Sequence, residues 1–247
     1  MCTLTWLFNS SSEGYSLFFN RDELRTRKRA LPPSLRKTKS GVSYLAPIDT
    51  DAGGTWLAVN QYGLTICLLN NYAAKEPANR EFKSRGEIVM RLIDSQSGAS
   101  VEDKLLAMDL SSYRGFQIVI FQRDVKEFSW NNISLTQLVP KVPVTSSSYN
   151  SEAVCLNRQK YFESLGDDVD IEMLAKFHRS HIDENMMLIS GPHQYVDSVC
   201  MHREHSKTVS QCSVQVSENQ VSIEYCDGAP CETSSAAAVV LQRRVAA

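Results

Sequence analysis

The sequence has no long run of apolar residues. No uncharged apolar stretch approaches the roughly 18 residues that indicate a transmembrane helix. The short apolar stretch from Leu4 to Phe8 is not preceded by the basic segment of a signal peptide. These absences predict a protein without a membrane span, and a cytoplasmic location is the default expectation.

Charge of neither sign is in excess. The chain carries 26 lysines and arginines against 28 aspartates and glutamates, which gives a net charge of −2. Binding to a nucleic acid or to an anionic membrane surface needs a basic face. We therefore expect neither of these partners.

Linkers, internal repeats and low-complexity segments are also absent. The chain has 247 residues, of which 43% are hydrophobic and 22% are charged, a composition that is typical of globular proteins. This length suits one large domain with a sizeable core, and we predict a single domain over residues 1–247. The sequence gives no indication of the oligomeric state.

Paired cysteine motifs are missing as well. The number of cysteines is odd, and none of them forms a Cys-x-x-Cys pair, so the sequence indicates neither a disulfide framework nor a zinc ribbon. We predict no bound metal, and we expect most thiols to be small buried side chains in a reducing compartment. The cysteines are Cys2, Cys67, Cys155, Cys200, Cys212, Cys226 and Cys231.

The sequence does contain the pattern of a β-hairpin at its start. Two runs rich in β-branched and aromatic residues flank a Ser/Asn/Gly segment within the first 23 residues. With a turn near residues 11–12, antiparallel pairing places Phe8 opposite Tyr15 and Cys2 opposite Arg21. Cross-strand neighbours have Cβ atoms about 4.5–5.5 Å apart. The second residue of the chain is therefore expected beside Arg21.

This arrangement suits an N-terminal nucleophile. Removal of Met1 would leave a thiol and an α-amine on the same carbon of Cys2. The amine titrates at about 7.7–8.0 and can serve as the base for the thiol, which titrates at about 8.5. Arg21 would favour the thiolate, and Asp22 could orient the amine. A lone cysteine beside a solvated strand end is the alternative, and the residues alone leave it open.

Motifs beyond the hairpin carry a family resemblance. In order, they are Asn20-Arg21-Asp22-Glu23, Gly53-Gly54-Thr55-Trp56-Leu57, Asn70-Asn71-Tyr72, Ser84-Arg85-Gly86-Glu87 and Lys207-Thr208-Val209-Ser210. With these motifs most of the chain resembles the NRDE family, also called the transport-and-Golgi-organisation protein 2 family. The resemblance implies an α+β fold of the N-terminal nucleophile hydrolase type, an αββα sandwich of two antiparallel sheets flanked by helices. This fold is distantly similar to choloylglycine hydrolases and penicillin V acylases.

The resemblance also assigns site residues. Cys2, Arg21 and Asp22 are candidate catalytic residues, and Asn71 is the candidate oxyanion-hole donor, because its amide can donate two hydrogen bonds. A plain strand-terminating asparagine is the alternative for Asn71. Relatives usually carry a Ser-Asn pair as a second donor where this chain has Ser147-Ser148, and this departure leaves amidase activity open. The candidate substrate-binding residues are Asn20, Glu23, Thr55, Trp56, Tyr72, Asn150 and Arg203, the last as a cation for an acidic substrate.

The remaining chain alternates strand and helix signals. The basic stretch 24–39 contains Pro32-Pro33, which excludes a helix or a central strand, and we expect an exposed loop that either rims a pocket or only connects two elements. Hairpins are expected at 55–70 and 116–130, and more strands at 198–225. Helices are expected at 80–96, from Ser100, from Asn157 and at 170–183, and a peripheral helix or frayed end at 234–247.

Two functions are compatible with the sequence. The first is a cofactor-free enzyme, in which Cys2 attacks an amide or thioester carbonyl of a small molecule. The second, suggested by family members linked to haem trafficking, is a non-enzymatic haem-binding protein on the same fold. No Cys-x-x-Cys-His motif is present, but histidines offer axial ligands in principle. His178 and His181 would share a face of the predicted helix, and His193 lies in a loop.

Overall fold

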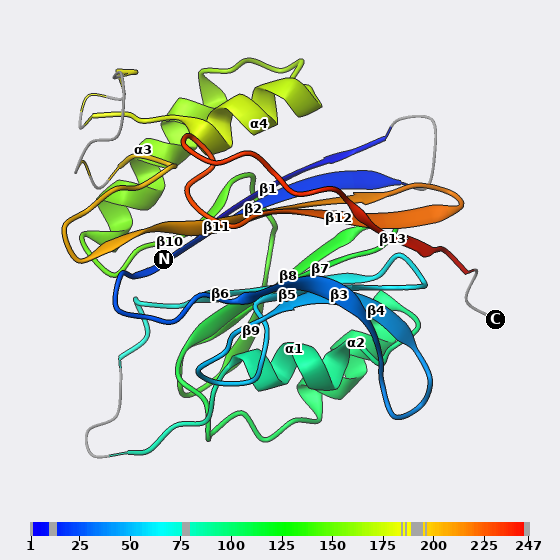
Figure 1. Cartoon of the computed structure of the whole chain (residues 1–247). Coiled ribbons are helices and arrows are strands. Elements are labelled where there is room, and N and C mark those ends of the chain that lie inside the picture. The colour runs from blue at the N-terminus through cyan, green and yellow to red at the C-terminus, as the bar shows by residue number, and fades with distance from the viewer. Residues whose placement is uncertain are drawn as a thin grey trace.

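The computed structural model describes residues 2–9, 14–75, 80–183, 185, 187–188, 195 and 197–244. Within them, two antiparallel sheets lie face to face, and a pair of helices covers the outer face of each (Figure 1). This is the αββα sandwich that the family resemblance predicts. Among the described residues, no helix is long and apolar enough to cross a membrane.

The first sheet contains both ends of the chain's described part. Its order is β10-β1-β2-β11-β12-β13. The strands are β1 (Cys2–Phe8), β2 (Tyr15–Leu24), β10 (Val144–Ser146), β11 (Ser206–Val216), β12 (Gln220–Cys226) and β13 (Val239–Gln242). The central position of β1 and β2 buries both strands between two neighbours.

The second sheet is built from the middle of the chain in sequence order, β3-β4-β5-β6-β7-β8-β9. Each strand therefore pairs antiparallel with the next one along the chain, and the connection from β6 to β7 contains two helices. The strands are β3 (Leu31–Lys37), β4 (Ser43–Ile48), β5 (Leu57–Asn60), β6 (Thr65–Asn70), β7 (Phe116–Phe121), β8 (Val125–Trp130) and β9 (Leu135–Leu138). The hairpins predicted at 55–70 and 116–130 are confirmed.

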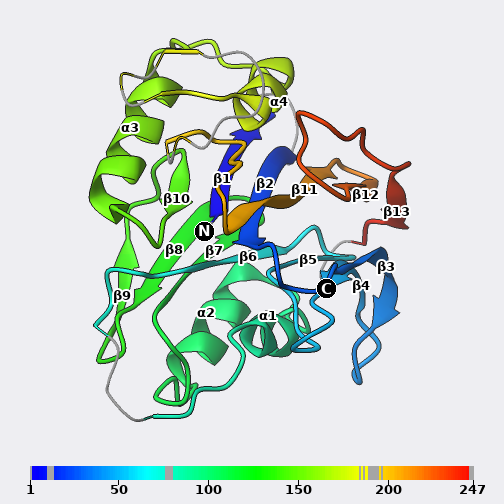
Figure 2. The ribbon, with the colours of Figure 1, turned by 60° about the vertical axis from the view of Figure 1, so that its left-hand side comes forward.

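Helices α3 (Ser151–Glu163) and α4 (Ile171–Arg179) pack on the first sheet. Helices α1 (Gly86–Leu92) and α2 (Gly98–Leu106) pack on the second. Figure 2 shows the same layers from a second direction, with α3 and α4 above the sheets and α1 and α2 below them.

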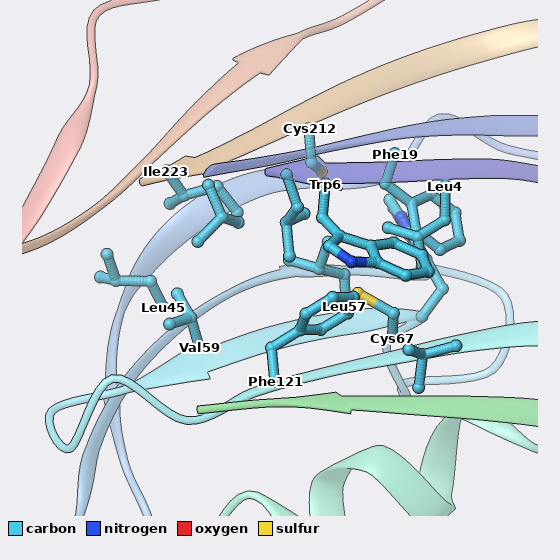
Figure 3. Close-up of a cluster of buried hydrophobic side chains, with 14 of the residues drawn as sticks. Leu4, Trp6, Phe19, Leu45, Leu57, Val59, Cys67, Phe121, Cys212 and Ile223 are labelled. Atoms are coloured by element: carbon cyan, nitrogen blue, oxygen red, sulfur yellow. The ribbon is translucent and has the colours of Figure 1, made fainter. Parts of the chain in front are cut away.

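Alternate residues of β1 face two different layers of the fold. Leu4 and Trp6 point into the core between the sheets, where they meet Phe19 and Phe121 (Figure 3). The rings of Trp6 and Phe121 lie edge to face, with centroids 5.3 Å apart. Thr3 and Thr5 point the other way, as the two-residue period of a strand requires, and both hydrogen bond to side chains of α3 and α4.

The predicted hairpin register is confirmed. Cys2 pairs with Arg21, and Phe8 pairs with Tyr15. The predicted turn near residues 11–12 lies outside the described residues. On its other side Cys2 pairs with Ser146 of β10, so the backbone of the candidate nucleophile is held between two strands.

Other predicted elements differ from the structure. Residues 31–37 form the edge strand β3, where prolines are tolerated because an edge strand needs fewer donors, and the pairing shifts register between Leu31 and Ser34. The segment 234–247 contributes strand β13 rather than a helix. Helix α1 begins only at Gly86, because the residues before it run extended beside Tyr113.

Three helix ends were also misplaced. Helix α2 begins at Gly98 because Ser97, not Ser100, is its N-cap, and the Ser97 hydroxyl accepts a hydrogen bond from the Ser100 amide. Helix α3 begins at Ser151, six residues before the predicted start. Helix α4 ends at Arg179, since Ser180 has extended backbone angles. His181 therefore leaves the helix that carries His178.

Candidate active site

A pocket of about 670 Å³ opens where β1 begins and β2 ends. It brings together residues from four of the sequence motifs, which lie far apart along the chain. Its lining residues are Cys2, Arg21, Asp22, Glu23, Arg27, Asp49, Ala52, Gly54, Thr55, Trp56, Leu68, Asn70, Arg80, Glu81, Phe82, Lys83, Ser84, Arg85, Gly86 and Arg114.

Cys2 provides the thiol of this pocket, and its residue is only 8% exposed. Burial raises the pKa of the thiol to about 11, and the charge of Asp22 acts in the same direction. A thiol with this pKa is almost entirely protonated at neutral pH, so attack by its sulfur requires a base. The hydroxyl of Ser146, across the strand pair, is buried and makes no hydrogen bond within the described residues.

Arg21 lines the pocket, and its guanidinium contacts two carboxylates and an aromatic ring. One of its terminal nitrogens lies 3.0 Å from an Asp49 carboxylate oxygen and 3.4 Å from one of Glu23. The guanidinium carbon lies 4.3 Å from the centre of the Trp56 ring, a cation–π distance. Two predicted substrate-binding residues, Glu23 and Trp56, therefore line the pocket and also fix Arg21.

Asp22 is buried beside Cys2 and is held by partners from distant segments. Its Oδ1 accepts a hydrogen bond of 2.6 Å from the Thr208 hydroxyl, and its Oδ2 lies 3.9 Å from a guanidinium nitrogen of Arg158. Burial raises the pKa of Asp22, while the positive charge of Arg158 lowers it. The motif residue Thr208 thus acts on the site through Asp22.

Arg158 is a site residue that the sequence interpretation missed. Its side chain is fully buried under the first sheet, and it donates to the Thr3 hydroxyl and to the backbone oxygens of Asp197 and Ser198. The sequence carried one signal of this role. Arg158 comes four residues after Val154 and therefore lies on the same, buried face of α3. A basic residue at a core position requires a buried partner, and that partner is Asp22.

Two glycine motifs are explained by a close backbone contact that lines the pocket. A Cβ on Gly54 would lie 2.6 Å from the backbone of Gly86, and one on Gly86 would lie 2.8 Å from the Thr55 nitrogen. Either side chain would force the two segments apart. Thr55, a predicted substrate-binding residue, lines the pocket, and its hydroxyl donates to the Leu57 carbonyl oxygen.

The pocket rim is rich in cationic side chains. Six basic and four acidic residues line the pocket. The guanidinium carbons of Arg80 and Arg114 lie 5.8 and 5.3 Å from the centre of the Phe82 ring. Arg27, from the stretch that the sequence predicts as a possible rim, also lines it. The rim therefore combines an apolar ring with positive charge and suits an anionic ligand that has an apolar part.

Asn71 and Asn20 are not among the described lining residues. The Asn71 amide nitrogen donates to the Ser129 hydroxyl and to the Trp130 carbonyl oxygen, both at 3.2 Å. Its neighbour Asn70 does line the pocket. The Asn20 amide is fully buried and donates to two backbone oxygens behind the sheet. In this structure the side-chain amides of both motif asparagines hydrogen bond to other segments of the chain.

The other predicted substrate-binding residues also lie outside the described lining. Tyr72 accepts a hydrogen bond from the Asn70 amide at 2.7 Å and so adjoins the pocket indirectly. Asn150 is the N-cap residue of α3 and has a left-handed backbone conformation. The guanidinium of Arg203 lies 5.1 Å from the centre of the Tyr149 ring.

The described histidines lie away from the pocket. The His178 Nε2 is paired with the Thr5 hydroxyl at 2.8 Å, and burial lowers the pKa of its ring to about 3. His181 instead lies with His202, Cys200 and Cys231 in a group of potential metal ligands. His178 and His181 therefore do not share a ligand as the helical spacing had suggested. His193 lies outside the described residues.

Comparisons with known proteins agree with this architecture. Residues 1–233 match the family described as Transport and Golgi organisation 2. Among curated proteins no sequence match is found. Two solved structures of conjugated bile acid hydrolase from Clostridium perfringens, a C2A mutant and an arginine-to-leucine variant, each align with a TM-score of 0.52 and 11% identity over 98% of this chain. The alignments cover 92% and 97% of those chains, and at this identity they show the fold.

Proposed function

The chain belongs to the Transport and Golgi organisation 2 family, and we propose that it is an N-terminal-cysteine amidohydrolase that cleaves an amide or thioester bond of a small molecule. The observation that carries this proposal is the position of Cys2. Its thiol lines a charged pocket on an N-terminal nucleophile hydrolase type of fold, directly opposite Arg21 and beside Asp22.

The proposed reaction begins after removal of Met1. The Cys2 sulfur attacks the carbonyl carbon, and the thiol proton passes to the α-amine of the same residue. The resulting ammonium returns the proton to the leaving amine as the carbon–nitrogen bond breaks, which leaves a thioester on Cys2. Water, deprotonated by the amine, then attacks the thioester and releases a carboxylic acid and the free thiol.

The α-amine is needed because the thiol is buried. A pKa of about 11 leaves little thiolate at neutral pH, whereas a free α-amine titrates at about 7.7–8.0 and can accept the proton. Asp22 supplies a carboxylate that can hold this amine in place. Arg21, fixed by Asp49 and Trp56, supplies positive charge that favours the thiolate.

The tetrahedral intermediate needs hydrogen-bond donors for its oxyanion. We place the side-chain donor in the Asn70-Asn71 pair at the end of β6. The family resemblance favours Asn71, while the pocket lining contains Asn70. Alanine substitution of each in turn identifies the donor, since loss of one oxyanion donor typically costs on the order of 10²–10³ in rate.

The substrate that the pocket suits is anionic near an apolar group. The rim offers Arg80, Lys83 and Arg114 around Phe82. The solved structures of similar fold are named as hydrolases of conjugated bile acids. We infer that the substrate here is a conjugate of an acyl group with an amino acid, which has an amide and a carboxylate. A free thiol persists in a reducing compartment, which fits the predicted cytoplasmic location.

The test combines a mass measurement with a substrate screen. Purified protein is treated briefly with iodoacetamide at neutral pH, and intact mass and peptide mapping show whether Met1 is absent and whether Cys2 reacts ahead of the other thiols. N-acyl amino acids of increasing chain length are then screened for release of the free amine. Cys2→Ala should abolish the preferential alkylation and the release of the free amine. Cys155→Ser, a substitution outside the pocket, should abolish neither. Retention of Met1 in the native protein would overturn the mechanism.

The haem-binding alternative finds less support in the pocket. The described lining residues include no histidine or methionine, so Cys2 would have to be the axial ligand. Haem titration with detection of a Soret shift tests this alternative, and a stoichiometric shift that Cys2→Ala removes would favour it over the amidohydrolase.

A further inference from the structure

Four potential metal ligands meet behind the first sheet, outside the candidate active site. They are His181, which follows α4, Cys200 and His202 in the segment before β11, and Cys231, which follows β12. The first three residues are buried and Cys231 is half-buried. Each offers one nitrogen or sulfur, and these four atoms all lie within 4.8 Å of one another.

The distances are close to those of a tetrahedral zinc site. The two sulfurs are 3.4 Å apart, and the His202 Nε2 lies 3.1 Å from the Cys231 sulfur and 3.6 Å from that of Cys200. Zinc–sulfur bonds of about 2.3 Å and zinc–nitrogen bonds of about 2.0–2.1 Å place tetrahedral ligand atoms roughly 3.3–3.8 Å apart. The three distances among Cys200, His202 and Cys231 therefore differ from these values by a few tenths of an ångström, and the His181 ligand nitrogen lies within 4.8 Å of each of these atoms.

A backbone hydrogen bond and a ring contact join three of the four residues independently of any ion. The Cys200 amide donates to the Ser180 carbonyl oxygen, which joins the segment of His181 to that of Cys200. The rings of His181 and His202 lie with centroids 5.3 Å apart. The Nε2 of His181, whose residue is 7% exposed, has no hydrogen-bond partner within the described residues. A buried polar nitrogen without a partner is costly, and a nitrogen of the same ring is one of the four potential ligand atoms.

We propose that His181, Cys200, His202 and Cys231 bind a structural Zn²⁺ ion. Two thiolates and two neutral imidazoles neutralise the ion, so the buried site carries no net charge, and both thiol protons are released on binding. Two sulfur and two nitrogen donors in a tetrahedron favour zinc. Four protein ligands fill the coordination sphere, which assigns a structural rather than a catalytic role.

The ion would fasten the segment that supports Asp22. Val199, next to Cys200, accepts a hydrogen bond from the motif residue Asn20. Met201, on the other side, donates its amide to the Thr208 hydroxyl and accepts at its carbonyl oxygen from the Thr208 amide. The same hydroxyl donates to Asp22. Zinc at this position would therefore connect α4, β11 and β12 at the point that fixes the Asp22 carboxylate.

The first test is metal analysis of the full-length protein purified without chelators. Elemental analysis should show close to one zinc per chain, and cobalt chloride added to the metal-free protein should give the absorption of tetrahedral cobalt with thiolate-to-cobalt charge transfer. Protein that retains no zinc, and that gives no such cobalt spectrum under reducing conditions, would overturn the proposal.

Matched cysteine variants separate the cluster from the other thiols. Cys231→Ser should weaken zinc binding by more than the roughly 10–100-fold that loss of an outer hydrogen-bond partner costs, and it should remove the charge-transfer band. Cys226→Ser should retain both, because Cys226 is the last residue of β12 and its thiol is not part of the group. Equal zinc content in the two variants would exclude the site.

The competing outcome is a disulfide between Cys200 and Cys231, since their sulfurs are 3.4 Å apart. Peptide mapping of protein isolated with its thiols blocked distinguishes the two. A disulfide in most molecules would overturn the zinc site in favour of a redox pair, whereas free thiols that zinc protects from alkylation would support it. Neither measurement depends on hydrolase activity, so failure of the proposed function leaves this test intact.

Discussion

Two chemical settings of cysteine can be compared in this chain. Cys2 is a buried thiol that lines a charged pocket together with Arg21 and Asp22. Cys200 and Cys231 lie in contact with each other and with the imidazole of His202, and neither is among the described lining residues of that pocket. Burial raises the pKa of the Cys2 thiol, and the charge of Asp22 acts in the same direction.

The difference shows that neighbours, rather than burial, decide what a thiol can do. Cys2 has no imidazole beside it within the described residues, so its proton needs another acceptor, and the α-amine is the group in reach once Met1 is removed. The clustered thiols have nitrogen and sulfur partners at the spacing that a tetrahedral ion requires. One setting therefore favours a nucleophile and the other favours ligands.

The largest effect is expected from Cys2→Ala. Loss of the nucleophile should lower kcat/KM by roughly 10⁴-fold or more, with the zinc content unchanged because the cluster does not include this thiol. Steady-state hydrolysis and elemental analysis on one preparation measure both quantities. Loss of zinc in this variant would show that the two cysteine settings are not independent.

Arg158→Met should give the largest loss of stability. The substitution leaves the buried Asp22 without its positive partner, and breaking a buried ion pair costs about 3–5 kcal/mol. Urea unfolding of the wild type, Arg158→Met, Asp22→Asn and the double variant measures this cost. The double variant should regain part of it; an additive loss would mean that Asp22 and Arg158 are not coupled in the folded state.

Thr208→Val tests the connection between the two settings. The substitution removes the hydrogen bond to Asp22 and leaves the Met201 amide without its side-chain acceptor, which should cost about 1–3 kcal/mol of stability. We expect kcat to fall about tenfold, because the Asp22 carboxylate would be misaligned. A tenfold fall corresponds to a rise of roughly 1.4 kcal/mol in the activation free energy. Thr208→Ser, which keeps the hydroxyl, should restore kcat.

The smallest effect concerns His178, a buried histidine that is not part of the cluster. Burial holds the folded-state pKa of His178 near 3, below its ordinary value of 6.5. The unfolded chain therefore binds a proton that the folded protein does not, and His178 removes stability as pH falls from about 6.5 towards 3. His178→Gln should flatten the pH dependence of unfolding in this window and leave zinc binding unchanged, whereas His181→Gln should remove zinc.

The elements that the sequence predicts well are those set by neighbouring residues. The pairing of Cys2 with Arg21 follows from strand alternation and one short turn, and the structure has that register. Errors arose where tertiary packing replaced local preference. The Pro32-Pro33 stretch became an edge strand by pairing with β4. Helix α1 begins only at Gly86, because the residues before it line the pocket and Lys83 pairs with Tyr113.

The sequence by itself determined the position of Cys2 beside Arg21, because the strand period and a short turn relate residues that are close together along the chain. Its motifs carried the family resemblance, and the resemblance implied the layers. Only the tertiary structure decided that Arg158 balances Asp22 and that four ligands from three segments converge. His181 and Cys231 are separated by fifty positions of chain, and no spacing rule relates them. Their proximity depends on how α4, β11 and β12 pack, since burial of the sheets brings their connecting segments together.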